Sequence, residues 1–68
     1  MKISDLQVGQ KVTIKWLLVE YQGIQKVKVS GFGKVEKRVF KGIGIEIFKY
    51  FSLNDGAKTL EKEGISLV

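Results

Sequence analysis

The sequence predicts an all-β domain: a small barrel of five short strands, with a short helical turn near the C-terminal end. Three observations support this prediction. Residues 10–51 contain stretches in which apolar and polar side chains alternate, which is the period of a half-buried strand. Glycine-containing steps separate these stretches, as tight turns require. The chain has 68 residues, which predicts a single domain over residues 1–68.

The first predicted strand runs from Gln10 to Tyr21, after a short turn over residues 4–9. Val12, Ile14 and Trp16 fall on one face of this strand, so we expect Trp16 to lie in the core. Polar residues occupy the other face. Beyond Trp16 both faces are apolar, which is typical of a strand that bends across a barrel.

A turn at Gln22-Gly23 is predicted to lead into a second strand over residues 25–30. Its valines would face inward and Lys26 and Lys28 outward, so the outward face is basic. Gly31-Phe32-Gly33 follows as a corner that carries an exposed aromatic ring.

Residues 31–51 predict a hairpin around which the rest of the chain is arranged. Residues 35–40 form its first strand, although the pattern does not decide which side is inward. Ile43, Ile45 and Ile47 then alternate with other residues and predict the second strand. The connection is expected over Lys41–Gly44, because glycine accepts the positive φ of short hairpin turns.

Two interpretations of residues 53–63 remain open. Ser52 and Asp55 form a capping-box pattern before apolar residues at helical spacing, which favours a short helix over residues 53–63. Alternatively, Asn54-Asp55-Gly56 is a hairpin turn followed by a strand over residues 57–60. In both cases residues 65–68 form the last strand.

The opening Leu6-Gln7-Val8-Gly9-Gln10-Lys11-Val12 resembles the L-x-V-G-x-x-V start of the first strand in OB-fold nucleic-acid-binding domains. These positions are structural in that family, so the resemblance implies no binding residue. An OB-fold usually inserts a helix between its third and fourth strands, whereas here only Gly42 and its neighbours separate them. The layout of five short strands resembles an SH3-like barrel more closely, and the strand order is left open between SH3-like and OB-like.

The composition argues against several chemistries. The chain has no cysteine and no histidine, so the usual zinc ligands, a thiol nucleophile and an imidazole base are missing. A carboxylate pair is the one remaining catalytic option. We therefore expect no enzyme, no cofactor and no metal. No apolar run approaches the roughly 18 residues that span a bilayer, and the N-terminus lacks a signal-like core, which predicts a cytoplasmic protein with no membrane association.

The net charge of +5 is concentrated in the middle of the chain. Residues 11–41 carry eight basic and two acidic side chains, whereas residues 42–68 carry three basic and four acidic ones. Lysines side by side on adjacent strands repel one another unless an anion neutralises them, which favours a polyanionic partner. The alternative is that these lysines only solubilise the sheet or protect its edges.

Aromatic residues interleaved with these lysines favour nucleic acid, whose bases stack on rings while its phosphates meet the charges. Tyr21, Phe32, Phe48 and Tyr50 are predicted to lie away from the isoleucine face; the alternative is that they form a second small core. The sequence thus predicts a DNA- or RNA-binding protein with low sequence specificity. The predicted phosphate contacts are Lys11, Lys15, Lys26, Lys28, Lys37 and Arg38, and the predicted stacking residues are Phe32, Phe48 and Tyr50.

A second hypothesis belongs to another class. The same basic strands would suit a small protein-interaction module or inhibitor that binds an acidic protein surface, or that adds a strand to a partner's sheet. A homodimer is compatible with both hypotheses. Aromatics clustered as one anchor would favour a protein partner, and aromatics spaced between lysines would favour nucleic acid.

Overall fold

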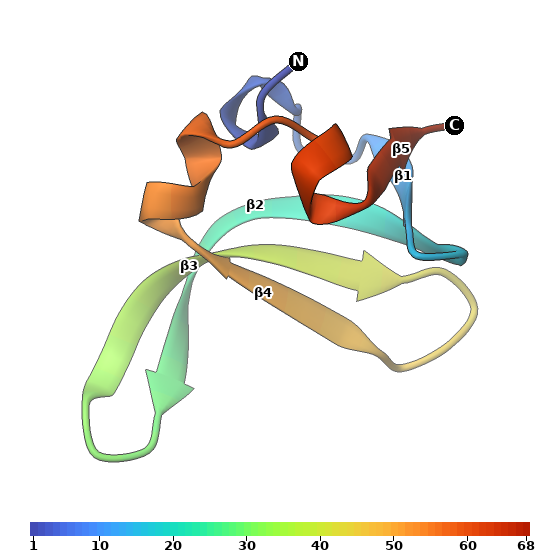
Figure 1. Cartoon of the computed structure of the whole chain (residues 1–68). Coiled ribbons are helices and arrows are strands. Elements are labelled where there is room, and N and C mark those ends of the chain that lie inside the picture. The colour runs from blue at the N-terminus through green and yellow to red at the C-terminus, as the bar shows by residue number, and fades with distance from the viewer.

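A computed structural model describes residues 1–68 (Figure 1). The protein consists of five β-strands and three short 3-10 helices. They follow in the order η1 (Ile3–Asp5), β1 (Lys11–Ile14), β2 (Leu17–Val29), β3 (Gly33–Gly42), β4 (Phe48–Ser52), η2 (Leu53–Ala57), η3 (Glu61–Glu63) and β5 (Ile65–Leu67). The prediction of an all-β fold with five strands is confirmed.

All five strands belong to one antiparallel sheet in the order β4-β3-β2-β1-β5. β2 has 13 residues, so its first part pairs with β1 while most of its length pairs with β3. Between Tyr21 and Gly23 the register shifts, and such bulges bend a strand. Figure 1 shows β2 curving through this region and the β2–β3 hairpin extending away from the rest of the molecule. The sheet is open, with β4 and β5 as its two edges.

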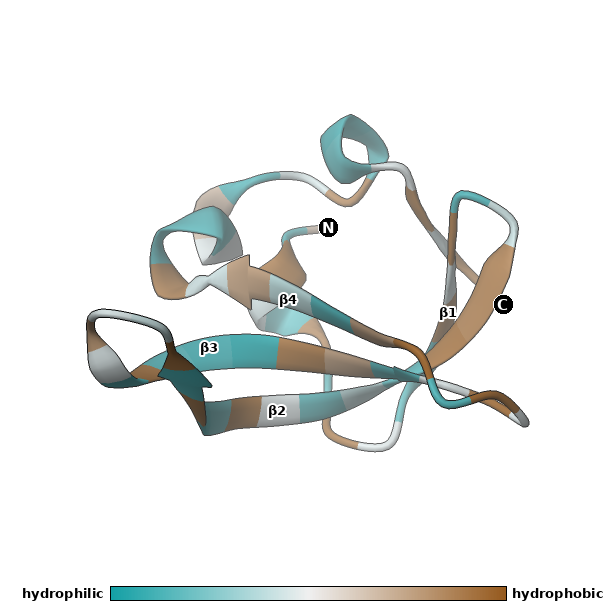
Figure 2. Ribbon diagram, turned by 90° about the horizontal axis from the view of Figure 1, so that it is seen from below, coloured by the Kyte–Doolittle hydropathy of each residue, from teal (hydrophilic) through white to brown (hydrophobic).

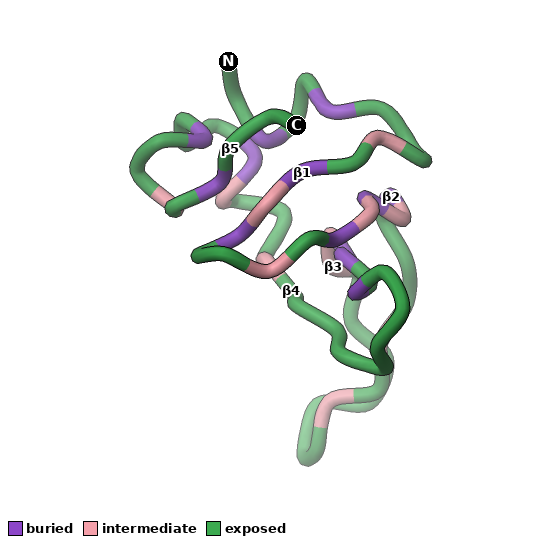
Figure 3. The backbone as a smooth tube through the Cα atoms, turned by 90° about the vertical axis from the view of Figure 1, so that its right-hand side faces the viewer, coloured by how far each residue is buried: buried purple, intermediate pink, exposed green.

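The core lies on one side of the sheet, which we call the inner face. Phe40 on β3 is fully buried there, and its ring centroid lies 5.0 Å from that of Tyr21 and 5.4 Å from that of Phe51. Residues from the segments before β1 and after β4 close the core from above. The cluster comprises Ile3, Leu6, Val12, Ile14, Val19, Tyr21, Phe40, Leu60 and Ile65. Figure 3 shows that buried residues gather in this region, whereas the end of the β2–β3 hairpin has none.

The prediction of one strand from Gln10 to Tyr21, with Trp16 in the core, is wrong. The strand is broken by a tight turn at Lys15-Trp16, and Ile14 pairs directly with Leu17 across it. Trp16 is therefore 100% exposed. The break restores the alternation, because Leu17 and Val19 return to the inner face that Val12 and Ile14 occupy.

Gln22-Gly23 is a bulge and not the predicted turn, so the second predicted strand is the continuation of β2. Lys26 and Lys28 are exposed along it, but the bulge places them on the core side of the sheet and the valines on the opposite side, which corrects the predicted faces. Tyr21, which was expected away from the core, is only 3% exposed. The bulge separates Tyr21 from the exposed part of the strand and leaves its ring against Phe40.

The isoleucine run is a loop, which corrects the prediction of a strand there. Residues 43–47 connect β3 to β4, and Gly44 has a φ of 77° that interrupts the extended backbone. The loop is held by the N–H of Gly42, which donates to the carbonyl of Ile47 at 2.7 Å. Ile43, Ile45 and Ile47 are each about two-fifths exposed (39%, 44% and 41%). The predicted hairpin exists, but its connection is longer than Lys41–Gly44.

Neither interpretation of residues 53–63 holds over its whole length. The capping pattern works locally, because the backbone N–H of Ser52 donates to Asp55 Oδ2 at 3.1 Å. The segment then forms two short 3-10 helices separated by an isolated bridge between Thr59 and Lys2. β5 follows at the predicted place and pairs with β1. None of the helices has the length and apolar character needed to cross a membrane.

Candidate nucleic-acid interface

The side of the sheet opposite the core, which we call the outer face, brings together lysines from β1 and β3 and aromatic rings from β4. Directly paired residues share a face of the sheet, and side chains alternate along each strand. Lys11, Glu20, Lys41 and Phe48 are paired in one row across β1, β2, β3 and β4. Figure 2 views the sheet from below and shows hydrophilic and hydrophobic residues alternating along β2, β3 and β4.

Phe48 and Tyr50 form a stacked pair on this face. They lie two residues apart on β4, their ring centroids are 6.3 Å apart and the angle between the ring planes is 12°. Each side chain is 47% exposed. β4 is an edge strand, so nothing in the sheet covers its outer side. The pair therefore presents a flat aromatic surface to solvent at the edge of the sheet.

Two lysines on β3 flank the stacked pair. Lys41 pairs with Phe48, and Lys37 pairs with Ser52, so both share the outer face with the rings. Lys41 is exposed and Lys37 is half-buried. Lys41 belongs to the basic middle of the chain but is not among the predicted phosphate contacts. Its position beside Phe48 depends on the β3–β4 register, which the mistaken strand at residues 43–47 concealed.

Lys11 lies on the same face at the far side of the row. Two strand spacings separate it from Lys41, which corresponds to about 10 Å. Glu20 stands between the two lysines and accepts a hydrogen bond from Gln22 Nε2 at 2.8 Å. The central carboxylate reduces the repulsion between the lysines on either side of it.

The β2–β3 hairpin carries a separate basic group, which we call the hairpin lysines: Lys26, Lys28 and Lys34. Lys28 pairs directly with Lys34, whereas Lys26 pairs with Glu36. By alternation these side chains belong to the side of the sheet that holds the core, beyond the point where the core ends. Phe32 lies in the turn at the tip and is 80% exposed. The structure thus separates Lys26, Lys28 and Phe32 from Phe48 and Tyr50.

Arg38 is half-buried, and its guanidinium is engaged within the fold. Its Nη1 donates to the hydroxyl of Tyr21 at 3.1 Å, and its Nε is buried without a hydrogen-bond partner. A Cβ added to Gly56 would lie 2.6 Å from Arg38 Nη2, so the guanidinium packs directly on the backbone of η2. This predicted phosphate contact therefore joins the sheet to η2.

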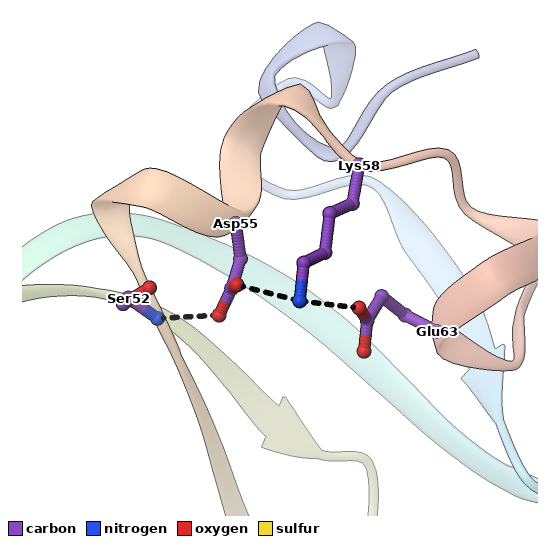
Figure 4. Close-up of polar contacts among 4 residues, drawn as sticks. All are labelled: Ser52, Asp55, Lys58 and Glu63. Carbon is purple, nitrogen blue, oxygen red and sulfur yellow. Dashed lines mark hydrogen bonds and ion pairs between the residues drawn. The ribbon is translucent and has the colours of Figure 1, made fainter.

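Two of the three acidic residues after β4, Asp55 and Glu63, are neutralised locally by Lys58. Lys58 Nζ lies 3.1 Å from Asp55 Oδ1 and 3.3 Å from Glu63 Oε1 (Figure 4). The hydrogen bond from Lys58, followed by the contact with Ser52, lowers the pKa of Asp55 below its usual 3.8. The hydrogen bonds to Asp55 and then Glu63 raise the pKa of Lys58 above its usual 10.5.

The last predicted contact, Lys15, lies in the β1–β2 turn at the end of the outer face.

Elsewhere in the molecule, no three side chains of the metal-ligating types His, Cys, Asp and Glu gather in one place. Comparison of the chain with protein-family models, curated proteins and solved structures finds no match.

Proposed function

We propose that the protein binds single-stranded nucleic acid with low sequence specificity through its outer face. The observation that carries the proposal is the half-exposed stacked pair Phe48–Tyr50 with Lys37 and Lys41 beside it. Bases stack on aromatic rings of any sequence context, while lysines attract the phosphates between them. The outer face has no amide or acidic side chain beside the ring pair to read base edges, which supports low specificity.

The hairpin lysines add a second contribution to the binding affinity, which comes from their charge and not from a defined contact geometry. Lys28 and Lys34 are like-charged cross-strand neighbours, and their repulsion is relieved when a phosphate approaches. They attract the polyanion without stacking a base. Within this proposal the open sheet is an incompletely closed form of the predicted small barrel, SH3-like in layout, and the protein is cytoplasmic. The pairing of β5 with β1 and the 3-10 helices between β4 and β5 support that fold.

Two variants separate the two contributions. The double substitution Phe48→Ala with Tyr50→Ala removes the rings and no charge, so the affinity falls while the salt slope stays the same. Charge reversal by Lys26→Glu with Lys28→Glu weakens binding to all sequences alike and makes the salt slope shallower. Both are measured by anisotropy of a labelled oligonucleotide. Unchanged affinity in both variants contradicts the proposal.

The competing function is binding to a protein. It is favoured by the exposed isoleucines of the β3–β4 loop, which adjoin Phe48 and lengthen the apolar surface at the β4 edge. A protein partner would bury this surface as an anchor and pair with the open β4 edge. Substitution of Ile45 by Ser distinguishes the two, because it removes apolar surface without touching the ring pair. Nucleic-acid binding should tolerate Ile45→Ser, whereas the protein-partner function predicts loss of the complex.

A further inference from the structure

The β1–β2 turn carries an unusual pair of residues. Lys15 has a φ of 47° and Trp16 a φ of 77°, and these are the only non-glycine residues with positive φ in the chain. A two-residue hairpin turn of this kind requires positive φ at both central positions, and Asn-Gly usually fills them. A bulky residue with positive φ is an outlier, and such strained residues concentrate at functional sites.

Packing does not account for Trp16. The side chain is 100% exposed, so the largest residue of the chain makes no contribution to the core. Trp16 is also the only tryptophan. A large aromatic side chain that is strained and fully exposed gains free energy only when a partner covers it.

A half-open hollow of about 520 Å³ lies beside the turn. It is lined by Thr13, Lys15, Trp16, Gly64 and Ser66. The backbone N–H of Lys15 donates to the carbonyl of Gly64 at 3.2 Å. A Cβ on Gly64 would lie 3.3 Å from Lys15 Cγ, so the aliphatic part of the lysine passes close to the Gly64 backbone. These contacts fix the ammonium-bearing side chain next to the hollow.

The chemistry of this lining matches a nucleotide. Its polar side chains are one ammonium group and two hydroxyls, with no carboxylate, which suits a phosphate. The indole beside them offers a stacking surface for a base. The hollow also continues the outer face, because Thr13 shares the face of Lys11 on β1 and pairs with Ser66 on β5.

We propose that the Trp16 turn is a second stacking site for single-stranded nucleic acid, at which the indole stacks an unpaired base and Lys15 binds its phosphate. This inference rests on the proposed function of the outer face. Glu20 and Phe48 lie in the same row of the sheet, two strands apart, because both pair with Lys41. Trp16 precedes Glu20 by four residues, so it lies on the order of 15 Å from Phe48. A stacked strand rises about 3.4 Å per nucleotide, so about five nucleotides connect the two sites.

The test uses the emission of Trp16, which reports on this turn alone because the chain has no other tryptophan. A labelled ten-nucleotide oligothymidylate is titrated while its anisotropy reports total binding. We expect it to quench Trp16, and a duplex of the same length to quench much less. Trp16→Ala should weaken binding of the oligothymidylate about five- to hundredfold, which is the effect of one lost stacking contact. Circular dichroism of the variant checks that it remains folded.

Lys15→Gln and Lys62→Gln form a matched pair, since each removes one exposed positive charge. Lys15→Gln should make the slope of log K against log salt shallower by about 0.7, and Lys62→Gln should leave it unchanged. The oligonucleotide could bind, as judged by anisotropy, without changing Trp16 emission and with the same affinity for Trp16→Ala as for the wild type. The turn would then not contact the nucleic acid, but the proposed function would stand. If anisotropy shows no binding at all, both proposals fail.

Discussion

Replacement of Trp16 by glycine is expected to stabilise the protein. A non-glycine residue in the left-handed region costs about 1–2 kcal/mol, and Trp16 has a φ of 77°. Glycine removes this cost but adds about 0.5–1 kcal/mol of backbone entropy to the unfolded chain. The fully exposed indole has no burial to lose. With the middle of each range, the net gain in the free energy of unfolding is about 0.75 kcal/mol.

In a domain of this size such a gain raises Tm by about 2–8 °C. Thermal unfolding followed by far-ultraviolet circular dichroism measures it without relying on tryptophan emission. Trp16→Ala is the control, because it removes the indole but keeps the Cβ that causes the strain, so its Tm should match the wild-type value. Equal Tm values for the glycine and alanine variants, or a lower Tm for both, would show that the turn is not strained.

Three further predictions concern the core, the β3–β4 loop and the dependence on pH. Phe40→Ala should cost about 3–5 kcal/mol and leave the protein largely unfolded at 25 °C, as urea titration of Phe40→Leu and Phe40→Ala in parallel can check. Gly42→Ala should lower the urea midpoint, because the new Cβ would lie 2.9 Å from Ile45 Cγ1 and 3.1 Å from the Ile45 carbonyl oxygen. The lowered pKa of Asp55 stabilises the fold above pH 4 and its contribution disappears as the pH falls through that lowered value, so thermal melts should show the difference in stability between wild type and Asp55→Asn shrinking as the pH is lowered from 4. The raised pKa of Lys58 acts in the opposite sense, and its contribution is lost only above pH 10.5.

The alternation of apolar and polar residues predicted a strand correctly where the same residues also pair with a neighbouring strand. The turn at Gly31 and Phe32 and the last strand lie where the pattern placed them. Lys26 and Lys28 are exposed as predicted, but the bulge at Gly23 puts them on the core side of the sheet and not on the predicted outward face. Phe48 and Tyr50 share an exposed face, as their spacing indicates. These features depend on the local sequence and on one face of the strand being apolar, so the order of apolar and polar residues is enough to predict them.

The remaining features depend on long-range pairing. Trp16 continues the apolar period of Val12 and Ile14, and Lys15-Trp16 contains none of the usual turn residues, so nothing local reveals the break. The end of β1 is defined instead by the pairing of Ile14 with Leu17 of β2 on one side and with Ile65 of β5 on the other. The turn was consequently missed, and with it the exposed indole.

A glycine within an alternating stretch can mark either a bulge inside a strand or the end of the strand, and the sequence does not distinguish the two. Gly23 marks a bulge inside β2 and not a chain reversal, and a Cβ there would lie 2.9 Å from Val8 Cγ2. Gly44 interrupts three alternating isoleucines and turns them into a loop. The position of Lys41 beside Phe48 follows from that loop, so this part of the site was not predictable from periodicity.

The most direct test of nucleic-acid binding by the outer face is a salt titration of oligothymidylate binding to the wild-type protein and to Lys37→Glu with Lys41→Glu. Contacts to three to six phosphates predict a wild-type slope of log K against log salt of about −2 to −4. The double variant should bind more weakly and with a shallower slope, and more weakly than Lys26→Glu with Lys28→Glu, which changes the net charge equally. No binding at low salt, or equal losses in the two double variants, would contradict the assignment of the interface to the outer face.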